Sequence, residues 1–275
     1  MYKCGITGGS GTLGKYLLKQ LPFRFSLYDN RIENKKKIFD WLSKNRFDLI
    51  IHLAAIVPTK NVESNYKKAL RVNYIGTKNI VDTINKNTNK PKWFFYASTS
   101  HVYNSVSNKK ILESTRIRPY SKYGFTKAKA EKYIKTNLKI PYAIGRIFSY
   151  THYNQSTSFL IPSLVKKIKA KKRKFVNLNH YRDFVHIDDI SSAINLMWKV
   201  KARGVFNIGS GKKINVKDIA TFLNKKINKR HKIFFNDNKE STSLIASNKK
   251  LKKRGWKPKK KIITILNDYL KKKDA

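Results

Sequence analysis

The sequence is poor in cysteine, in acidic residues and in long apolar runs. Cys4 is the only cysteine among 275 residues, which excludes a disulfide scaffold and a metal site built from several thiolates, and we predict no metal site. The longest nearly uncharged apolar run, Leu49 to Pro58, is about half of the roughly 20 residues that cross a bilayer. A glycine-rich segment follows almost directly on the N-terminus and leaves no room for the apolar core of a signal peptide. We therefore expect a soluble, cytoplasmic protein.

The shortage of acidic residues leaves a large positive charge. The chain has 61 lysines and arginines against 16 aspartates and glutamates, a formal net charge of +45, which attracts nucleic acid, acidic lipids and phosphorylated metabolites alike. The densest tract, Lys249 to Lys261, contains Trp256 and could dock on an anionic membrane or RNA, or simply form a solvated surface. Because lysine is spread along the whole chain without a groove-reading or stacking signature, we favour the solvated surface. We predict no specific nucleic-acid partner and leave open a loose contact with an anionic membrane surface.

A short strand, a glycine-rich turn and a helix open the chain. The predicted strand Tyr2 to Thr7 runs into GGSGTLG, in which every third residue from position 8 to 14 is glycine, and leucines then recur at helical spacing. Glycine lets the backbone approach a diphosphate closely, and the N-terminus of the helix offers unpaired N–H groups to it. A structural loop is the alternative, but the position between strand and helix favours dinucleotide binding. The predicted cofactor contacts of this turn are Gly8, Ser10, Gly11, Thr12, Leu13 and Gly14.

The next strand bears on the choice of cofactor. Phe23 to Tyr28 is a predicted strand that ends at Asp29, roughly 20 residues past the glycines, where a carboxylate can bind the adenosine ribose and repel a 2′-phosphate. Arg31 could instead accept that phosphate, so we predict NAD and leave NADP open. The stretch Asn30 to Lys37 is short enough to replace a separate third strand by a loop.

Two further segments place small and polar residues near the predicted cofactor. Asp48 to Val57 reads as a buried strand, and Ala54 and Ala55 near its end leave space for a cofactor across the strand tips. The apolar helix that follows contains Asn73 in a mainly buried stretch. A buried amide must find partners, so Asn73 either caps a neighbouring backbone segment or belongs to a proton relay.

A hydroxyl-rich strand end and a Tyr-Lys pair suggest catalysis. The strand KWFFYAST breaks into hydroxyls at Ser98, Thr99 and Ser100, and Tyr123 is followed by Lys127 on the same helical face. A tyrosine hydroxyl, with an ordinary pKa near 10, is a poor base, but an adjacent ammonium, helped by a nicotinamide cation, favours its phenolate and should lower that pKa. Thr99 would then hold the oxygen of the carbon that exchanges a hydride. An exposed Tyr-Lys pair on an amphipathic helix is the alternative.

These motifs together resemble the extended short-chain dehydrogenase/reductase family, in particular its NAD-dependent nucleotide-sugar epimerases, dehydratases and reductases. TGGSGTLG is similar to the cofactor turn of that family, and VNYIGTKN is similar to its segment with the relay asparagine, Asn73. The resemblance implies Thr99, Tyr123 and Lys127 as catalytic residues, with Lys127 also contacting the cofactor. In RDFVHIDD it implies that Arg182 contacts the diphosphate of a sugar nucleotide, and it further implies a homodimer.

The sequence departs from the family's dehydratases directly after Thr99. Dehydratases generally carry an Asp-Glu pair there, whereas this chain has Ser100 and His101, so a 4,6-elimination lacks an obvious acid and base. His101 could exchange a proton with a sugar carbon, because imidazole titrates near neutrality, or could merely line the pocket. We keep His101 as a catalytic candidate and expect His186 to be structural.

The order of predicted elements indicates an α/β fold, a Rossmann-like doubly wound parallel sheet with a small C-terminal substrate-binding lobe. Strands alternate with helices up to Phe148, with Pro141 to Phe148 as the sixth strand, and the alternation fails over Ser149 to Tyr181. We predict a dinucleotide-binding domain from residues 1–148 plus 183–208 and a substrate lobe from 149–182 plus 209–275. The active site would lie in the cleft between them.

The resulting hypothesis is an NAD(P)-dependent oxidoreductase that reduces the keto group of a 4-keto sugar nucleotide, with Tyr123 as acid/base and the nucleotide sugar as substrate. A nucleotide-sugar C4 epimerase with tightly bound NAD is the alternative. Two less favoured alternatives from other classes of protein are a basic nucleic-acid-binding protein and a non-catalytic dinucleotide sensor. A sensor would not need the Tyr-Lys pair.

Overall fold

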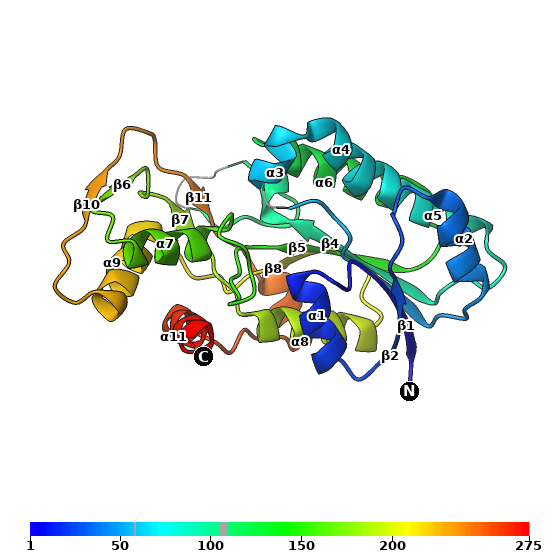
Figure 1. The fold of residues 1–275 in the computed structure, drawn as a ribbon. Helices are drawn as coiled ribbons and strands as arrows, with labels where there is room; N and C mark the ends of the chain where they lie inside the picture. The colour runs from blue at the N-terminus through cyan, green and yellow to red at the C-terminus, as the bar shows by residue number, and fades with distance from the viewer. Residues whose placement is uncertain (58, 105–108, 275) are drawn as a thin grey trace.

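The computed structural model describes residues 1–57, 59–104 and 109–274, and its main feature is a sheet of six parallel strands (Figure 1). In spatial order the strands are β2 (Arg24–Tyr28), β1 (Lys3–Thr7), β3 (Leu49–His52), β4 (Trp93–Thr99), β5 (Tyr142–Ile147) and β8 (Gly204–Ile208). The chain leaves β1 towards one edge and returns to its other side at β3, which creates the crevice where such sheets bind ligands. The predicted doubly wound parallel sheet is confirmed.

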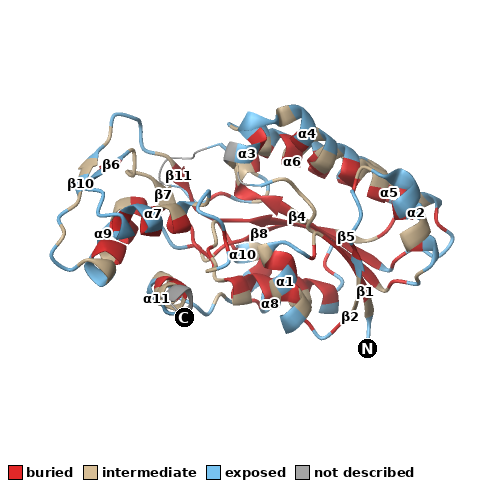
Figure 2. Cartoon of the chain, viewed as in Figure 1, coloured by how far each residue is buried: buried red, intermediate tan, exposed pale blue. Residues whose placement is uncertain are grey.

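Helices cover both faces of this sheet (Figure 1). One face carries α1 (Thr12–Gln20), α8 (Ile187–Lys199) and the short α10 (Lys249–Lys252). The other carries α3 (Thr59–Ser64), α4 (Tyr66–Leu70), the π-helical turn η1 (Arg71–Ile75), α2 (Lys35–Ser43), α5 (Gly76–Lys86) and α6 (Lys122–Asn137). Figure 2 shows that the buried residues of these helices face the sheet.

The alternation of side chains along the strands supplies both cores. In β4, Trp93 and Phe95 pack with the residues of α8 and α1, whereas Phe94 and Tyr96 pack with those of α5 and α6. All four are fully buried. A central parallel strand is covered on both faces, which is why its sequence is an unbroken apolar run.

Two sequence predictions about strands need correction. The segment from Leu53 to Val57 is not part of a strand, because β3 ends at His52 and the chain there turns across the strand tips. The strand predicted as the sixth is β5, the fifth in chain order, because residues 30–34 form a loop and the chain then enters α2. Asn34 begins that helix by accepting a hydrogen bond from the Lys37 N–H.

A smaller set of elements lies beside the sheet (Figure 1). It contains two short sheets, β6 (Lys174–Val176) with β10 (Phe234–Asn236), and β7 (Tyr181–Arg182) between β11 (Ser243–Leu244) and β9 (Ile214–Asn215). The helices α7 (Leu160–Lys169), α9 (Val216–Ile227) and α11 (Ile262–Asp274) share an apolar core with them. None of the helices in the described ranges is both long and apolar enough to cross a membrane.

Two aspartates tie the smaller elements to the sheet. The buried Asp183 carboxylate accepts hydrogen bonds from the backbone N–H groups of Ser210, Gly211 and Ala246 and from the Ser210 hydroxyl. Asp189 in α8 accepts from the backbone of Lys259 and Lys260. These contacts fix the turns that follow β8 and α10.

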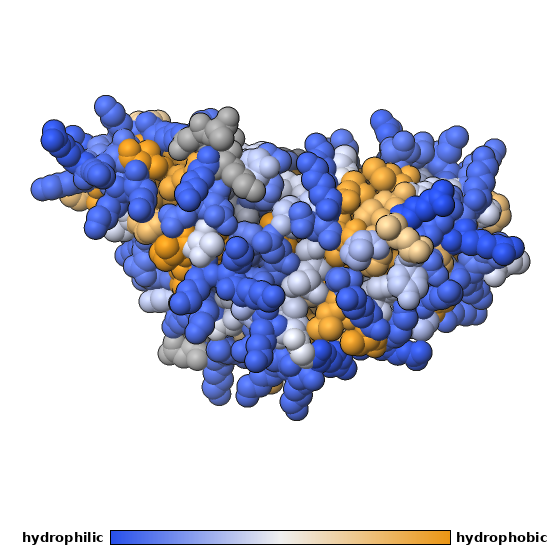
Figure 3. All heavy atoms as spheres, turned by 90° about the horizontal axis from the view of Figure 1, so that it is seen from below, coloured by the Kyte–Doolittle hydropathy of each residue, from blue (hydrophilic) through white to orange (hydrophobic). Residues whose placement is uncertain are grey.

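The basic tract Lys249 to Lys261 is part of this packed structure. Leu251 and Trp256 lie in the core beneath the sheet, so the predicted lobe range 209–275 includes a stretch that packs on the sheet. Trp256 is 3% exposed and donates its indole N–H to the Asp189 carbonyl, which leaves no exposed ring there for stacking on RNA bases. On the face drawn in Figure 3, hydrophilic residues surround separate apolar patches, as expected for a solvated lysine-rich surface.

Candidate active site

The glycine turn joins β1 to α1 through backbone that other residues could not adopt. Gly8 has φ +70°, and a Cβ there would lie 2.7 Å from the Ala54 nitrogen. A Cβ at Gly14 would collide with the Gly8 carbonyl, so this glycine lets α1 pack directly on the turn. The first turn of α1 holds no acidic residue, so its free N–H groups and partial positive charge suit a dinucleotide diphosphate.

A cavity of about 530 Å³ extends from this turn along the carboxyl ends of β3, β4 and β5. It brings together nearly all residues that the sequence singled out, from segments far apart in the chain. The predicted residues that line it are Gly8, Ser10, Gly11, Thr12, Leu13, Gly14, Ala54, Ala55, Thr99, His101, Tyr123, Lys127 and Arg182. Asp29 and Asn73 do not line it.

The end of β4 and the start of α6 are held against one another. Thr99 accepts a hydrogen bond at Oγ1 from the His101 N–H (3.2 Å) and so begins the 3₁₀ turn η2 (Ser100–Val102). Ser121 caps α6 by accepting from the Gly124 N–H. A side chain on Gly124 would collide with the His101 carbonyl, so only glycine lets α6 approach η2 this closely. The approach places Tyr123 beside Thr99, and both residues line the cavity.

Burial dominates the titration of the Tyr-Lys pair. It raises the pKa of Tyr123, as does the neighbouring Tyr150, and the Thr99 contact opposes them. Burial also lowers the pKa of Lys127 to about 7, against the pull of the Glu131 carboxylate. The predicted lowering of the tyrosine pKa combined the Lys127 ammonium with the charge of the cofactor. It is not seen in the protein alone, because both groups are enclosed and each is pushed towards its neutral form. The Lys127 ammonium lies 4.1 Å from the centre of the Tyr96 ring.

Asn73 sits in η1 with its amide fully engaged. Its Oδ1 accepts from the Ile56 N–H at 2.6 Å, and its Nδ2 donates to the Ile56 carbonyl at 3.3 Å and to the Thr126 hydroxyl at 3.0 Å. It thereby ties the segment that carries Ala54 and Ala55 to α6. Of the two predicted roles, this geometry is that of a cap for neighbouring backbone.

A buried histidine continues this set of contacts. His52, at the end of β3, lies 2.6 Å from the Thr7 hydroxyl through Nδ1 and 2.9 Å from the Thr77 hydroxyl through Nε2. Burial, together with the charge of Lys127, lowers its pKa to about 3. His52 is thus a neutral structural residue that joins β1, β3 and α5.

The opposite end of the cavity is aromatic and basic. Arg182 in β7 donates to the carbonyls of Tyr181 and Thr242 and to the Thr242 hydroxyl, which fixes its guanidinium at the cavity wall. His101 stacks on Tyr120 with ring centres 5.5 Å apart, and its Nδ1 lies 3.2 Å from the Tyr120 hydroxyl. Burial, and then the Arg182 charge, lowers the pKa of His101 to about 4. His101 is therefore neutral at physiological pH.

Several cavity residues escaped the sequence reasoning. Tyr120 precedes α6 and belongs to no periodic pattern, and Tyr150 and Gln155 lie in the irregular stretch that sequence analysis could only assign to the lobe. The buried Asp183, which lies next to the cavity residue Arg182, was also missed. Its position directly after Arg182 is the one sequence feature that could have identified it. His186 caps α8 by accepting from the Asp188 N–H, as expected for a structural residue.

The residues predicted to choose between NAD and NADP lie outside the main cavity. Asp29 is exposed at the end of β2 and accepts a hydrogen bond from the Asn30 side chain. Arg31 lines a second cavity of about 530 Å³, next to Ile56 and Glu33. The other basic residues of that cavity are Lys67, Lys68 and Arg71. This concentration of positive charge is compatible with binding of the 2′-phosphate of NADP, so NADP remains an alternative to NAD.

Comparison with known proteins adds the following findings. A family model described as GDP-mannose 4,6-dehydratase matches residues 18–269. The chain is 29% identical over 223 residues to UDP-glucose 4-epimerase of Mycoplasma genitalium, in an alignment that covers 71% of this chain and 64% of that protein. It is 24% identical over 245 residues to GDP-6-deoxy-D-mannose reductase of Pseudomonas aeruginosa, covering 79% of this chain and 78% of that protein. The structure of RMD from Pseudomonas aeruginosa complexed with NADPH superposes with a TM-score of 0.87 at 22% identity over 98% of both chains, which shows the shared fold.

Proposed function

This chain belongs to the GDP-mannose 4,6-dehydratase family of extended short-chain dehydrogenases/reductases, and we propose that it is an NAD(P)-dependent enzyme that reduces the 4-keto group of a nucleotide-linked sugar. One observation carries the proposal. A single cavity joins the glycine turn, the hydroxyls of Thr99 and Tyr123, the Lys127 amine and the Arg182 guanidinium. These are the groups needed to bind a dinucleotide, a keto oxygen and a diphosphate in reach of one another.

The cofactor, when bound, supplies the hydride. The residues Gly8 to Gly14 would hold its diphosphate, and Ala54 and Ala55 leave room for it across the strand tips. Lys127 would contact its ribose. The relatives that are named for work on UDP-glucose or GDP-linked sugars, and the NADPH in the related structure, support this assignment of cofactor and substrate class.

Tyr123 would donate its hydroxyl proton to the oxygen of the carbon that receives the hydride. Its raised pKa keeps that proton in place at neutral pH, which suits an acid in the direction of reduction. Thr99, which lines the cavity beside Tyr123, would orient the keto oxygen. Arg182 would bind the diphosphate of the sugar nucleotide, and the elements 149–182 and 209–275 would enclose the sugar.

The residues after Thr99 argue against dehydration. An elimination needs an acid and a base near the sugar, whereas the neighbours here are the buried Ser100 and a neutral His101. A C4 epimerase with tightly bound NAD is the second candidate, because the same residues serve it and the Mycoplasma relative is named as one.

A panel of nucleotide sugars and their 4-keto derivatives, each with NADH and NADPH followed by absorbance, tests the proposal. A reductase consumes reduced cofactor in proportion to the 4-keto substrate. An epimerase interconverts nucleotide sugars without net consumption. If the protein catalyses neither reaction with any nucleotide sugar of the panel, the proposed function is refuted.

A further inference from the structure

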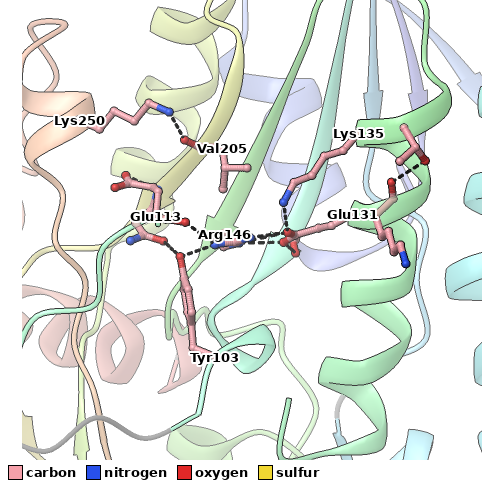
Figure 4. A network of polar contacts seen from close by, with 11 residues as sticks. Tyr103, Glu113, Glu131, Lys135, Arg146, Val205 and Lys250 are labelled. Atoms are coloured by element: carbon pink, nitrogen blue, oxygen red, sulfur yellow. Dashed lines mark hydrogen bonds and ion pairs between the residues drawn. The ribbon is translucent and has the colours of Figure 1, made fainter. Parts of the chain in front are cut away.

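A buried ion pair joins α6 to β5 (Figure 4). Glu131 is fully buried, and its carboxylate accepts from Arg146 through Nε (3.0 and 3.2 Å) and Nη2 (2.6 Å). Arg146, on β5, also donates to the Tyr103 hydroxyl at 2.6 Å and to the Glu113 carbonyl at 3.1 Å. Taking two charges out of water is costly, and an apolar pair of similar volume would serve α6 and β5 equally well as packing. Packing alone therefore does not explain why a charged pair lies between α6 and β5.

The Glu131 carboxylate also contacts a residue that lines the active-site cavity. Ser98 donates its hydroxyl to Glu131 Oε1 at 2.5 Å, and Ser98 lines the cavity directly before Thr99. Lys127 lies one helical turn before Glu131 on α6, so both side chains point along the same face of the helix. Glu131 thus touches the strand that carries Thr99 and stands behind the lysine of the Tyr-Lys pair.

The surroundings of Lys127 oppose a positive charge on it. The side chain is 2% exposed, and burial is the largest influence on it. From β3 it faces the neutral His52, from β4 the Tyr96 ring, and on its own helix Tyr123. Among the described groups, the carboxylate of Glu131 is the one that favours the ammonium. Arg146 lies beyond Glu131, and Lys135 approaches Glu131 at 3.6 Å from the more exposed side.

We propose that Glu131 is a positioning residue of this enzyme, whose carboxylate offsets part of the effect of burial on Lys127 and which fixes the Thr99 end of β4 through Ser98. The proposal rests on the proposed function for its catalytic meaning, but the effect on Lys127 can be measured without substrate. The Arg146 guanidinium, 2.6 Å from the Glu131 carboxylate, supplies the partner that a buried acidic side chain requires.

The direct test is the titration of Lys127 by NMR of lysines labelled with ¹³C at Cε, with its signal assigned from Lys127→Arg. We expect a midpoint near pH 7 in the wild-type protein. Unit charges about 6 Å apart at an effective dielectric constant near 20 shift a midpoint by roughly two pH units, so Glu131→Gln should lower it to about pH 5. Glu113→Gln is the matched control, since it removes a carboxylate from the same network at the Asn207 backbone and should leave the midpoint unchanged.

The single variant leaves Arg146 buried without its partner and could fail to fold. The double variant Glu131→Gln with Arg146→Met removes both charges, and its midpoint should lie between those of the wild type and the single variant. A midpoint within about 0.3 pH units of wild type in either folded variant would overturn the proposal.

Turnover gives the second readout. An ammonium beside Tyr123 stabilises the phenolate that remains after the tyrosine donates its proton, so turnover should follow the protonated fraction of Lys127. A fall of that fraction at pH 7 from one half to about one part in a hundred predicts a roughly 50-fold loss of kcat/KM in Glu131→Gln that shrinks towards pH 5. A merely structural role would give the same loss at every pH and would contradict the proposal. A wild-type protein that turns over no nucleotide sugar would refute the proposed function, while the NMR titration would still decide whether Glu131 controls Lys127.

Discussion

Replacing Asn73 by alanine tests the interpretation of this residue as a structural tie. The change removes the contacts at 2.6 and 3.3 Å to both backbone groups of Ile56 and the contact at 3.0 Å to Thr126. A buried polar group left without a partner costs about 1–3 kcal/mol. Asn73 is fully buried and the N–H and carbonyl of Ile56 both lose their partner, whereas the Thr126 hydroxyl keeps the Tyr123 carbonyl, so we expect the free energy of unfolding to fall by about 3 kcal/mol.

Urea denaturation of Asn73→Ala, with Asn79→Ala as control, measures this loss. Among the described residues the Asn79 side chain makes a single hydrogen bond, to the Glu33 carbonyl at 3.0 Å, so its removal should cost about 1 kcal/mol. Cofactor affinity should weaken in Asn73→Ala, because the segment with Ala54 and Ala55 loses its tie to α6. A variant as stable as the control, with normal cofactor affinity but a collapsed kcat, would refute this reasoning and favour the proton relay.

Four other outcomes follow from the same structure. Tyr123→Phe should abolish turnover, a loss of at least about 100-fold, with cofactor affinity nearly intact by fluorescence titration; normal turnover would remove Tyr123 from the mechanism. Asp29→Ala should relax discrimination against NADP and Arg31→Ala should weaken NADP(H) alone, and unchanged KM values for both cofactors would place the choice elsewhere. His52 is neutral when folded, with its pKa at about 3 against an ordinary 6.5, so the unfolded chain binds the extra proton and the contribution of His52 to the free energy of unfolding should fall by about 2 kcal/mol from pH 6.5 to pH 5; a His52→Gln variant with the same pH slope as the wild type would contradict this. Retention of unrelated RNA and DNA on filters should be weak and non-specific, and tight binding with a steep salt dependence would contradict the solvated-surface reading of Lys249 to Lys261.

Local sequence signals were sufficient for the sheet and for most of the cavity. The glycine turn, the hydroxyls at the end of β4 and the Tyr-Lys spacing each follow from short-range backbone geometry, and the parallel sheet then brings their strand ends to one edge. Thr99, Tyr123 and Lys127 line the same cavity for this reason.

Residues placed by tertiary packing could not be predicted in this way. Arg182 was identified only through the resemblance to a family, and Tyr120 became visible only once α6 was seen against η2. The titration of Lys127 depends on complete enclosure and on Glu131, which no spacing rule could weigh. The same enclosure raises the Tyr123 pKa in the protein without cofactor.

The most direct test of hydride transfer to a sugar carbon in this cavity uses a reduced cofactor that carries deuterium at the transferred position of its nicotinamide. Incubation with a 4-keto nucleotide sugar should give a product that is one mass unit heavier than the product made with unlabelled cofactor, with the deuterium at C4 by NMR. The Tyr123→Phe variant should form almost none of this labelled product. A product without deuterium at C4, or equal labelling by the Tyr123→Phe variant, would contradict the account.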